Sequence, residues 1–257
     1  MTPRSKPGHI PLSDESFDFP VCGHPKYFYF VASTERSGST YLCTMLWRTG
    51  ILGAPVEYFN FNNIMLQMAV RLGTQSLDEY LHRLFEVRSS PNGVFGAKIH
   101  WPHLQFLILS KLLTRFPNAR WIFIDRRDAV AQAVSYAKAV QTQQWRSSAI
   151  PQATPKFDFD TILQWHKQLV ADKNAWHTFL RSAKVQPLIV FYEDFIERAD
   201  AITAEIVVKL GFPAEPHGTP MAPEVARQGD ETNLEWTARF RKEAAQQGIS
   251  LQDILAV

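Results

Sequence analysis

The chain has 257 residues, of which 46% are hydrophobic and 20% are charged, proportions typical of a globular protein and unlike those of a disordered chain. Its net charge of +2 is too small for nucleic-acid binding by bulk electrostatics, so any anion site must be local. The two cysteines, Cys22 and Cys43, exclude a disulfide framework and a four-cysteine zinc site. The length fits one large α/β domain spanning 1–257.

The N-terminal residues 1–25 carry five prolines and little periodicity, which predicts an irregular arm. They contain no apolar core of a signal peptide, and no later apolar run reaches the length that spans a membrane. We therefore expect a cytoplasmic protein without a transmembrane segment.

The stretch 27–50 predicts a strand, a loop and a helix in succession. Residues 27–32 are aromatic and β-branched, as in a strand buried on both faces. Leu42, Met45 and Leu46 then recur at helical spacing, and Gly50 stands where a helix would end. Such a junction points backbone N–H groups and the positive end of a helix dipole at one place, which suits a phosphate.

The loop between this strand and helix carries Arg36, Ser37, Gly38, Ser39 and Thr40. A guanidinium and three hydroxyls favour a phosphate-binding loop. The alternative is an ordinary turn in which Ser37 caps the helix. The loop lacks the Gly-x4-Gly-Lys-[Ser/Thr] spacing of a Walker A motif, which argues against an NTPase or a kinase.

Further strands and helices alternate along the chain. The sequence predicts strands over 94–99, 120–125 and 187–192, and helices over 64–72, 76–85, 129–140, 160–182 and 234–247. It also predicts a helix that Pro102 opens and that ends before Pro117, and a helix after the fourth strand that ends at Gly211. Residues 143–157 lack apolar periodicity and predict a mobile loop. This alternation predicts a three-layer α/β fold, with a central, mainly parallel sheet and helices on both faces.

A second anion-binding pattern follows the third predicted strand. Arg126 stands at its carboxyl end, and Ser135 comes nine residues later in the next helix. In an open parallel sheet, ligands bind beyond the carboxyl ends of the strands, so this pair and the loop 36–40 share one edge. The alternative is that Arg126 and Asp128 form a surface ion pair.

Four motifs in this order resemble the bacterial trehalose 2-sulfotransferase-like family, whose members use 3′-phosphoadenosine 5′-phosphosulfate (PAPS). The motifs are Arg-Ser-Gly-Ser-Thr at 36–40, Gly-Ile-Leu-Gly-Ala-Pro-Val-Glu-Tyr-Phe at 50–59, Gln-Ala-Val-Ser-Tyr at 132–136 with its continuation to Trp145-Arg146, and Arg-Gln at 227–228. The resemblance implies the P-loop-like sulfotransferase fold and sulfuryl transfer to a hydroxyl of a carbohydrate or glycolipid, such as a trehalose-like sugar. A homodimer is compatible with it.

The resemblance also implies residue roles. Residues 36–40 would hold the 5′-phosphosulfate, with Arg36 also acting in catalysis, and Arg126 with Ser135 would hold the 3′-phosphate. Arg227 would belong to a C-terminal loop that closes over the cofactor. Glu57 would be the general base, and no metal is implied.

Two residues compete for the role of base. Glu57 is flanked by Val56, Tyr58 and Phe59, so we expect a partly desolvated carboxylate with a raised pKa. His100 follows the second strand and is the rival, although a histidine beside Trp101 is more often packed in the core. Substrate contacts are assigned to Tyr58, Lys98, His100 and Trp101. The spacing of His100 and His103 could serve a metal, but no third ligand stands near them in the sequence.

Two other functions remain open at the level of the sequence. One is a nucleotide-binding small-molecule kinase, which the missing Walker lysine argues against. The other is a non-catalytic nucleotide-binding protein, which the presence of Arg36, Glu57, Arg126 and Ser135 together argues against.

Overall fold

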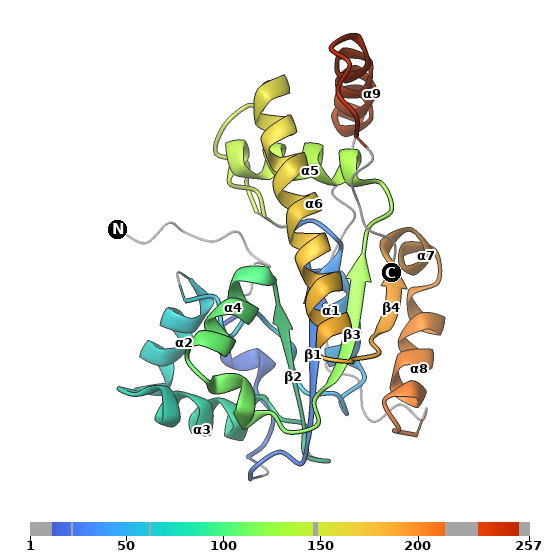
Figure 1. Ribbon diagram of the computed structural model, residues 1–257. Coiled ribbons are helices and arrows are strands. Elements are labelled where there is room, and N and C mark those ends of the chain that lie inside the picture. Colours follow the sequence, from blue (N-terminus) through green and yellow to red (C-terminus); the bar gives the residue numbers. More distant parts are fainter. Residues whose placement is uncertain (1–11, 22, 62, 146–148, 214–230, 252–257) are drawn as a thin grey trace.

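A four-stranded parallel sheet forms the centre of the molecule (Figure 1). The computed structural model describes residues 12–21, 23–61, 63–145, 149–213 and 231–251. The strands are β1 (Tyr27–Ser33), β2 (Val94–Ile99), β3 (Arg120–Asp125) and β4 (Leu188–Phe191), in the order β2-β1-β3-β4. Three of the four strands lie where the sequence predicts them, and β4 is shorter by one residue at each end.

The side chains of β1 alternate between two cores. Phe28, Phe30 and Ala32 belong to one hydrophobic cluster, whereas Tyr29 and Val31 belong to another. Since neighbouring side chains of a strand point to opposite faces, the sheet must be covered on both sides. This confirms the three-layer α/β architecture.

Helices cover the two faces. The described elements are α1 (Ser39–Arg48), α2 (Ile64–Leu72), α3 (Leu77–Arg88), α4 (Trp101–Leu109), α5 (Ala129–Thr142), α6 (Phe159–Ser182), α7 (Tyr192–Glu197), α8 (Ala199–Lys209), α9 (Glu231–Gln246) and the 3-10 turns η1 (Glu15–Phe17) and η2 (Leu112–Arg115). The helix α6 crosses the front of the sheet in Figure 1, and α1 lies behind it. Above the sheet, α5 packs against α6 and α9.

Several predicted boundaries are revised. The helix expected between the fourth strand and Gly211 is divided into α7 and α8, and the helix expected to end before Pro117 ends as α4 at Leu109, followed by η2. In the predicted loop 143–157, the described residues bond to α5: Gln152 N donates to Thr142 O at 2.8 Å, and Lys156 N donates to Gln141 Oε1 at 2.8 Å. Of the predicted N-terminal arm, residues 1–11 and 22 lie outside the described residues.

The described residues 51–61 run along the outer edge of β2 without forming a helix. Val56 makes an isolated parallel bridge to Ala97, and Lys98 N donates to Val56 O at 3.0 Å. This short pairing brings residue 57 next to residue 98. It therefore determines where Glu57 lies relative to the sheet.

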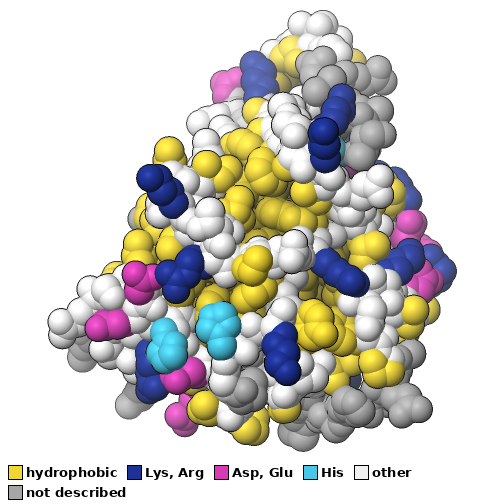
Figure 2. All heavy atoms as spheres, turned by 60° about the horizontal axis from the view of Figure 1, so that its bottom comes forward, with side chains coloured by type: hydrophobic (Ala, Val, Ile, Leu, Met, Phe, Trp, Pro, Cys, Tyr) yellow, Lys and Arg dark blue, Asp and Glu magenta, His cyan; other side chains and the backbone are white. Residues whose placement is uncertain are grey.

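On the face shown in Figure 2, basic and acidic side chains are interspersed, and hydrophobic side chains gather near the centre. Within the described ranges, the helices include none that is long and apolar enough to cross a membrane.

Candidate active site

The loop between β1 and α1 forms an open helix N-terminus. Gly38 occupies the N-cap position with φ +85°, and no side chain caps the helix. The hydroxyl of Ser37 is buried and has no hydrogen-bond partner among the described residues. The interpretation of Ser37 as an ordinary N-cap is therefore wrong. A buried hydroxyl without a partner among the described residues, next to free helix N–H groups, favours the binding of an anion.

Tyr192 holds this loop close to α7. A Cβ built on Gly38 would lie 2.4 Å from Tyr192 Cδ2, a separation that no side chain can tolerate. The tyrosine ring also faces the guanidinium of Arg126, with Cζ 4.8 Å from the ring centroid. Gly38 is thus required twice, by its positive φ and by this close approach.

Arg36, Arg126 and Ser135 come together at the carboxyl edge of the sheet. Arg36 Nε donates to Ser135 Oγ at 3.0 Å, and Arg126 Nη1 donates to the carbonyl of Arg36 at 3.4 Å. Burial, with a contribution from Arg126, lowers the pKa of Arg36 to about 10. Because the positive charge of Arg126 acts on that of Arg36, a negative charge bound at this edge would relieve their repulsion.

The predicted surface ion pair of Arg126 with Asp128 is not what the structure contains. Asp128 pairs instead with Arg241 of α9 at 2.8 Å, and it caps α5 by accepting from Ala131 N. The backbone of Arg126 is fixed by the buried Lys173, whose Nζ donates to the carbonyl of Arg126 at 2.7 Å. The guanidinium of Arg126 is directed at the loop of Arg36, because its Nη1 donates to the carbonyl of Arg36.

Glu57 lies in a cluster with Lys98 and His100. Lys98 Nζ is 2.7 Å from Glu57 Oε1, and His100 Nε2 is 3.4 Å from the same oxygen. The other oxygen, Oε2, accepts from Asn60 Nδ2 at 2.9 Å. The cluster reaches the anion-binding loop, since Lys98 Nζ also donates to Thr40 Oγ1 at 2.9 Å.

The expected raised pKa of Glu57 is wrong. Burial does act to raise the pKa, but the charges of Lys98, His100 and His103 together hold it well below its usual range. The sequence shows the apolar neighbours of Glu57, whereas its cationic neighbours arrive through the pairing of segment 51–63 with β2. At neutral pH, Glu57 is therefore ionised.

His100 is a buried histidine at the N-cap of α4. Burial acts to lower its pKa, but the carboxylates of Glu35 and Glu57 raise it above the usual value. Its Nδ1 lies 3.1 Å from Ser33 Oγ, and its backbone N–H donates to His103 Nδ1 at 3.2 Å. Burial and His100 lower the pKa of His103 to about 3. No group of three potential metal ligands occurs in the described part of the chain.

The aromatic residues assigned to the substrate differ in position. Tyr58 is fully buried and its hydroxyl donates to Ala54 O, so it is a core residue and its assignment to the substrate is corrected. Trp101 is partly exposed and packs edge-on against Trp176, with ring centroids 5.6 Å apart. Arg227 lies outside the described residues.

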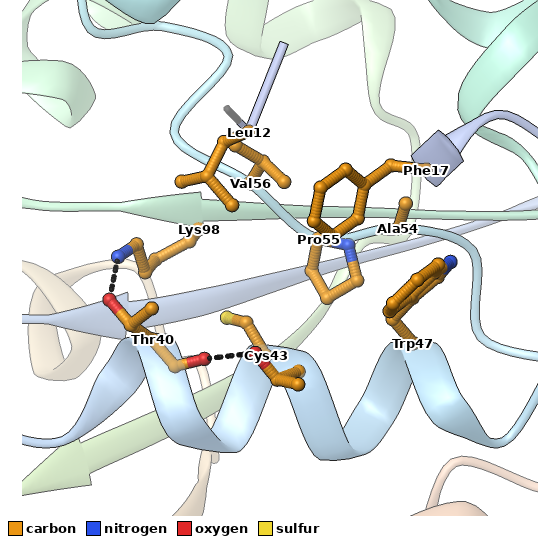
Figure 3. Close-up of a pocket in the computed structure, with 10 residues that line it drawn as sticks. Leu12, Phe17, Thr40, Cys43, Trp47, Ala54, Pro55, Val56 and Lys98 are labelled. Carbon is orange, nitrogen blue, oxygen red and sulfur yellow. Dashed lines mark hydrogen bonds between the residues drawn. The ribbon is translucent and has the colours of Figure 1, made fainter. Parts of the chain in front are cut away.

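A small pocket lies between α1 and residues 54–56 (Figure 3). Its walls include Cys43, Trp47 and Val56, and the side chain of Lys98 enters it on the way to Thr40. Burial raises the pKa of the Cys43 thiol to about 12, so Cys43 packs as a small apolar residue. Lys98 is thus almost completely buried, with 3% of its side chain exposed.

Residues that the sequence analysis did not assign also shape the site. Gln132 Nε2 donates to Thr34 Oγ1 at 2.8 Å and to the carbonyl of Glu35 at 2.6 Å, which fixes the start of the anion-binding loop. The signal was present, because Gln132 opens the third of the four motifs. Asn60 supports Glu57 from only three residues along the chain, in a local contact that none of the four motifs includes.

The chain is similar to known proteins over most of its length. The sequence model of the Stf0 sulphotransferase family matches residues 28–243. Trehalose 2-sulfotransferase of Mycolicibacterium smegmatis is 27% identical, the alignment covering 87% of this chain and 97% of that protein. Trehalose 2-sulfotransferase of Mycobacterium tuberculosis is also 27% identical, with 86% and 97% covered.

A similar fold occurs among solved structures. The sulfotransferase domain from the curacin biosynthetic pathway superposes with a TM-score of 0.50 at 14% sequence identity, covering 88% of this chain and 98% of that domain. At this identity, the similarity concerns the fold alone.

Proposed function

Because the chain belongs to the Stf0 sulphotransferase family, we propose that it moves a sulfuryl group from PAPS to a hydroxyl of a carbohydrate or glycolipid. A trehalose-like sugar is the first acceptor to test, given the names of the two relatives. The observation that carries the proposal is the carboxylate of Glu57 beside the loop 36–40, whose buried Ser37 hydroxyl has no partner within the described structure.

The reaction follows from these positions. The acceptor oxygen forms a bond to sulfur while the bond from sulfur to the 5′-phosphate oxygen breaks, and adenosine 3′,5′-bisphosphate leaves. As in phosphoryl transfer, the protein mainly aligns the two partners and stabilises charge on the leaving oxygen. The N-terminus of α1 and Arg36 supply that stabilisation, and Glu57 takes the proton of the hydroxyl.

The protonation states favour Glu57 over His100 as the base. A base must be unprotonated, and the lowered pKa of Glu57 ensures this at neutral pH. His100 has a raised pKa, so a larger fraction of it carries a proton and cannot accept another. In this arrangement His100 orients Glu57 through its Nε2.

The second anion site fits the 3′-phosphate. Arg126 and Ser135 lie next to Arg36, so one cofactor could span from the N-terminus of α1 to the N-terminal half of α5. Arg227 is assigned to a loop that closes over the cofactor, as the family resemblance implies. We further propose a cytoplasmic enzyme that needs no metal and acts alone or as a homodimer.

Transfer of labelled sulfate is the direct test. The purified protein is incubated with 35S-labelled PAPS and a panel of trehalose, other sugars, glycolipids and small alcohols. We expect a labelled product with at least one carbohydrate-containing acceptor and none with the Glu57→Gln variant. Labelling of small alcohols alone would contradict the carbohydrate assignment, and failure to bind adenosine 3′,5′-bisphosphate would contradict the whole proposal.

A further inference from the structure

Lys98 connects the carboxylate of Glu57 to the anion-binding loop. Its Nζ lies 2.7 Å from Glu57 Oε1 and 2.9 Å from Thr40 Oγ1, and its side chain is only 3% exposed. Thr40 belongs to the first turn of α1, whose N–H groups would face the phosphosulfate. The ammonium therefore stands between the expected base and the expected cofactor.

The position of the Lys98 ammonium conflicts with the role of Glu57 as a general base. An ion pair at 2.7 Å in a partly buried site stabilises the carboxylate and lowers its affinity for a proton. A carboxylate held in this way is ionised but weakly basic. The same contact therefore opposes the step that Glu57 is proposed to perform.

Lys98 also has the means to change partners. An ammonium has three N–H donors, of which Glu57 and Thr40 take two in the described structure. Lys98 lies at one end of the pocket in Figure 3, with its ammonium pointing to Thr40. A dianionic group at the N-terminus of α1 would compete directly with Glu57 for this head.

We propose that Lys98 is shared between Glu57 and the cofactor: binding of the phosphosulfate draws the ammonium from Glu57 towards the transferring group, and this frees the carboxylate to accept the acceptor's proton. This inference rests on the proposed sulfuryl transfer. Glu57 remains oriented after the exchange by Asn60 at 2.9 Å and by His100 at 3.4 Å. The base is thus activated only when the donor is bound, and Lys98 meets charge on the leaving oxygen as the bond from sulfur breaks.

A double-mutant cycle on nucleotide binding tests this exchange. Adenosine 3′,5′-bisphosphate is titrated by calorimetry into the wild type, Glu57→Gln, Lys98→Met and the double variant. In Glu57→Gln, the ligand no longer competes for Lys98, so we expect about tenfold tighter binding. In the Lys98→Met background, the same Glu57→Gln change should alter Kd by less than about twofold.

A matched ligand separates this effect from general repulsion. Adenosine 3′-monophosphate lacks the 5′-phosphate, so its Kd should be nearly unchanged by Glu57→Gln. If Glu57→Gln tightens the bisphosphate equally in both backgrounds, or fails to tighten it in the wild type, Lys98 is not shared and the inference is wrong. Lys98→Gln provides a second, polar replacement should Lys98→Met fail to fold, as judged by circular dichroism and thermal melting.

The failure of the two proposals can be told apart. A wild type that binds the bisphosphate and transfers sulfate, but gives an additive cycle, contradicts only the sharing of Lys98. A wild type that neither binds the bisphosphate nor transfers sulfate contradicts both.

Discussion

The guanidinium of Arg36 and the hydroxyl of Ser135 are joined by a hydrogen bond of 3.0 Å from Nε to Oγ. This bond connects the loop after β1 to α5, which follows β3, so it links the two anion sites across neighbouring strands. A nucleotide with phosphates on the 3′ and 5′ positions of its ribose would need the two predicted anion sites to lie this close together.

Removing the second anion site should weaken one class of nucleotide selectively. We expect the double variant Arg126→Ala, Ser135→Ala to lose more affinity for adenosine 3′,5′-bisphosphate than for adenosine 5′-monophosphate, which lacks the 3′-phosphate. Each charge-assisted contact is worth about 1.5–3 kcal/mol. Calorimetric titration of both ligands measures the difference. Equal losses would show that this pair does not hold the 3′-phosphate.

Binding of the bisphosphate should also stabilise the fold. A ligand that binds only the native state adds about 2.7 kcal/mol at 100 times its Kd, which corresponds to a rise in melting temperature of about 5–10 °C for a chain of this size. Differential scanning fluorimetry with and without the nucleotide measures this rise. Adenosine is the control ligand, since it lacks both phosphates and should give little shift.

Gly38 offers a test of the loop itself. Gly38→Ala combines a φ of +85° with a Cβ 2.4 Å from Tyr192, so we expect a lower melting temperature and a loss of bisphosphate binding. Gly73→Ala is the matched control, because its φ is +66° and nothing lies within 4 Å of the added Cβ. Gly73→Ala should cost some stability through backbone strain but should leave nucleotide affinity unchanged. Equal affinity losses in both variants would mean that the contact with Tyr192 does not matter.

The sequence predicts most of the fold because its strong signals are local. The strands β1, β2 and β3 are apolar runs with clear ends, and their carboxyl edge collects the arginines and hydroxyls that follow them. The contact of Arg36 with Ser135 could be expected only in outline, since both residues belong to predicted anion sites on one sheet edge.

The electrostatics of Glu57 could not be predicted in the same way. Its cationic neighbours depend on the bridge of Val56 with Ala97, a pairing of a single residue that no periodicity in the sequence indicates. The sequence shows only the apolar neighbours of Glu57 along the chain, and these indicate a raised pKa. Tyr58 was misassigned for the same reason, because the bridge also fixes which residues of this segment enter the core.

Asp172 of α6 predicts a stability effect that depends on pH. Burial, with a contribution from Glu35, raises its pKa to about 6, against an unfolded value of about 3.9; the amide of Gln168 and the charge of His100 oppose this rise. Because the folded value is the higher one, the stabilising contribution is complete below the unfolded pKa and is lost as pH rises through about 6. We therefore expect Asp172→Asn to raise the melting temperature at pH 7.5 and to have little effect at pH 4.

The control for this prediction lies on the same helix. Asp160 is exposed in the first turn of α6, so Asp160→Asn should not raise the melting temperature at pH 7.5. A stabilisation by Asp172→Asn that is the same at both pH values would show that burial of its charge is not the cause.

The choice of base decides the mechanism, and two substitutions separate the candidates. Glu57→Gln keeps the shape of the side chain, and its amide oxygen can still accept the hydrogen bond from Asn60. The amide cannot, however, take the proton of the acceptor. We expect kcat to fall about 10²-fold or more while the nucleotide still binds. His100→Asn removes a residue that orients Glu57 at 3.4 Å, so we expect a smaller loss.

Both variants must be measured with the same acceptor, and their PAPS affinities must be measured separately, so that binding and turnover are not confused. If Glu57→Gln keeps most of its kcat while His100→Asn abolishes it, the base is His100, and the ionised Glu57 serves to hold that histidine in place.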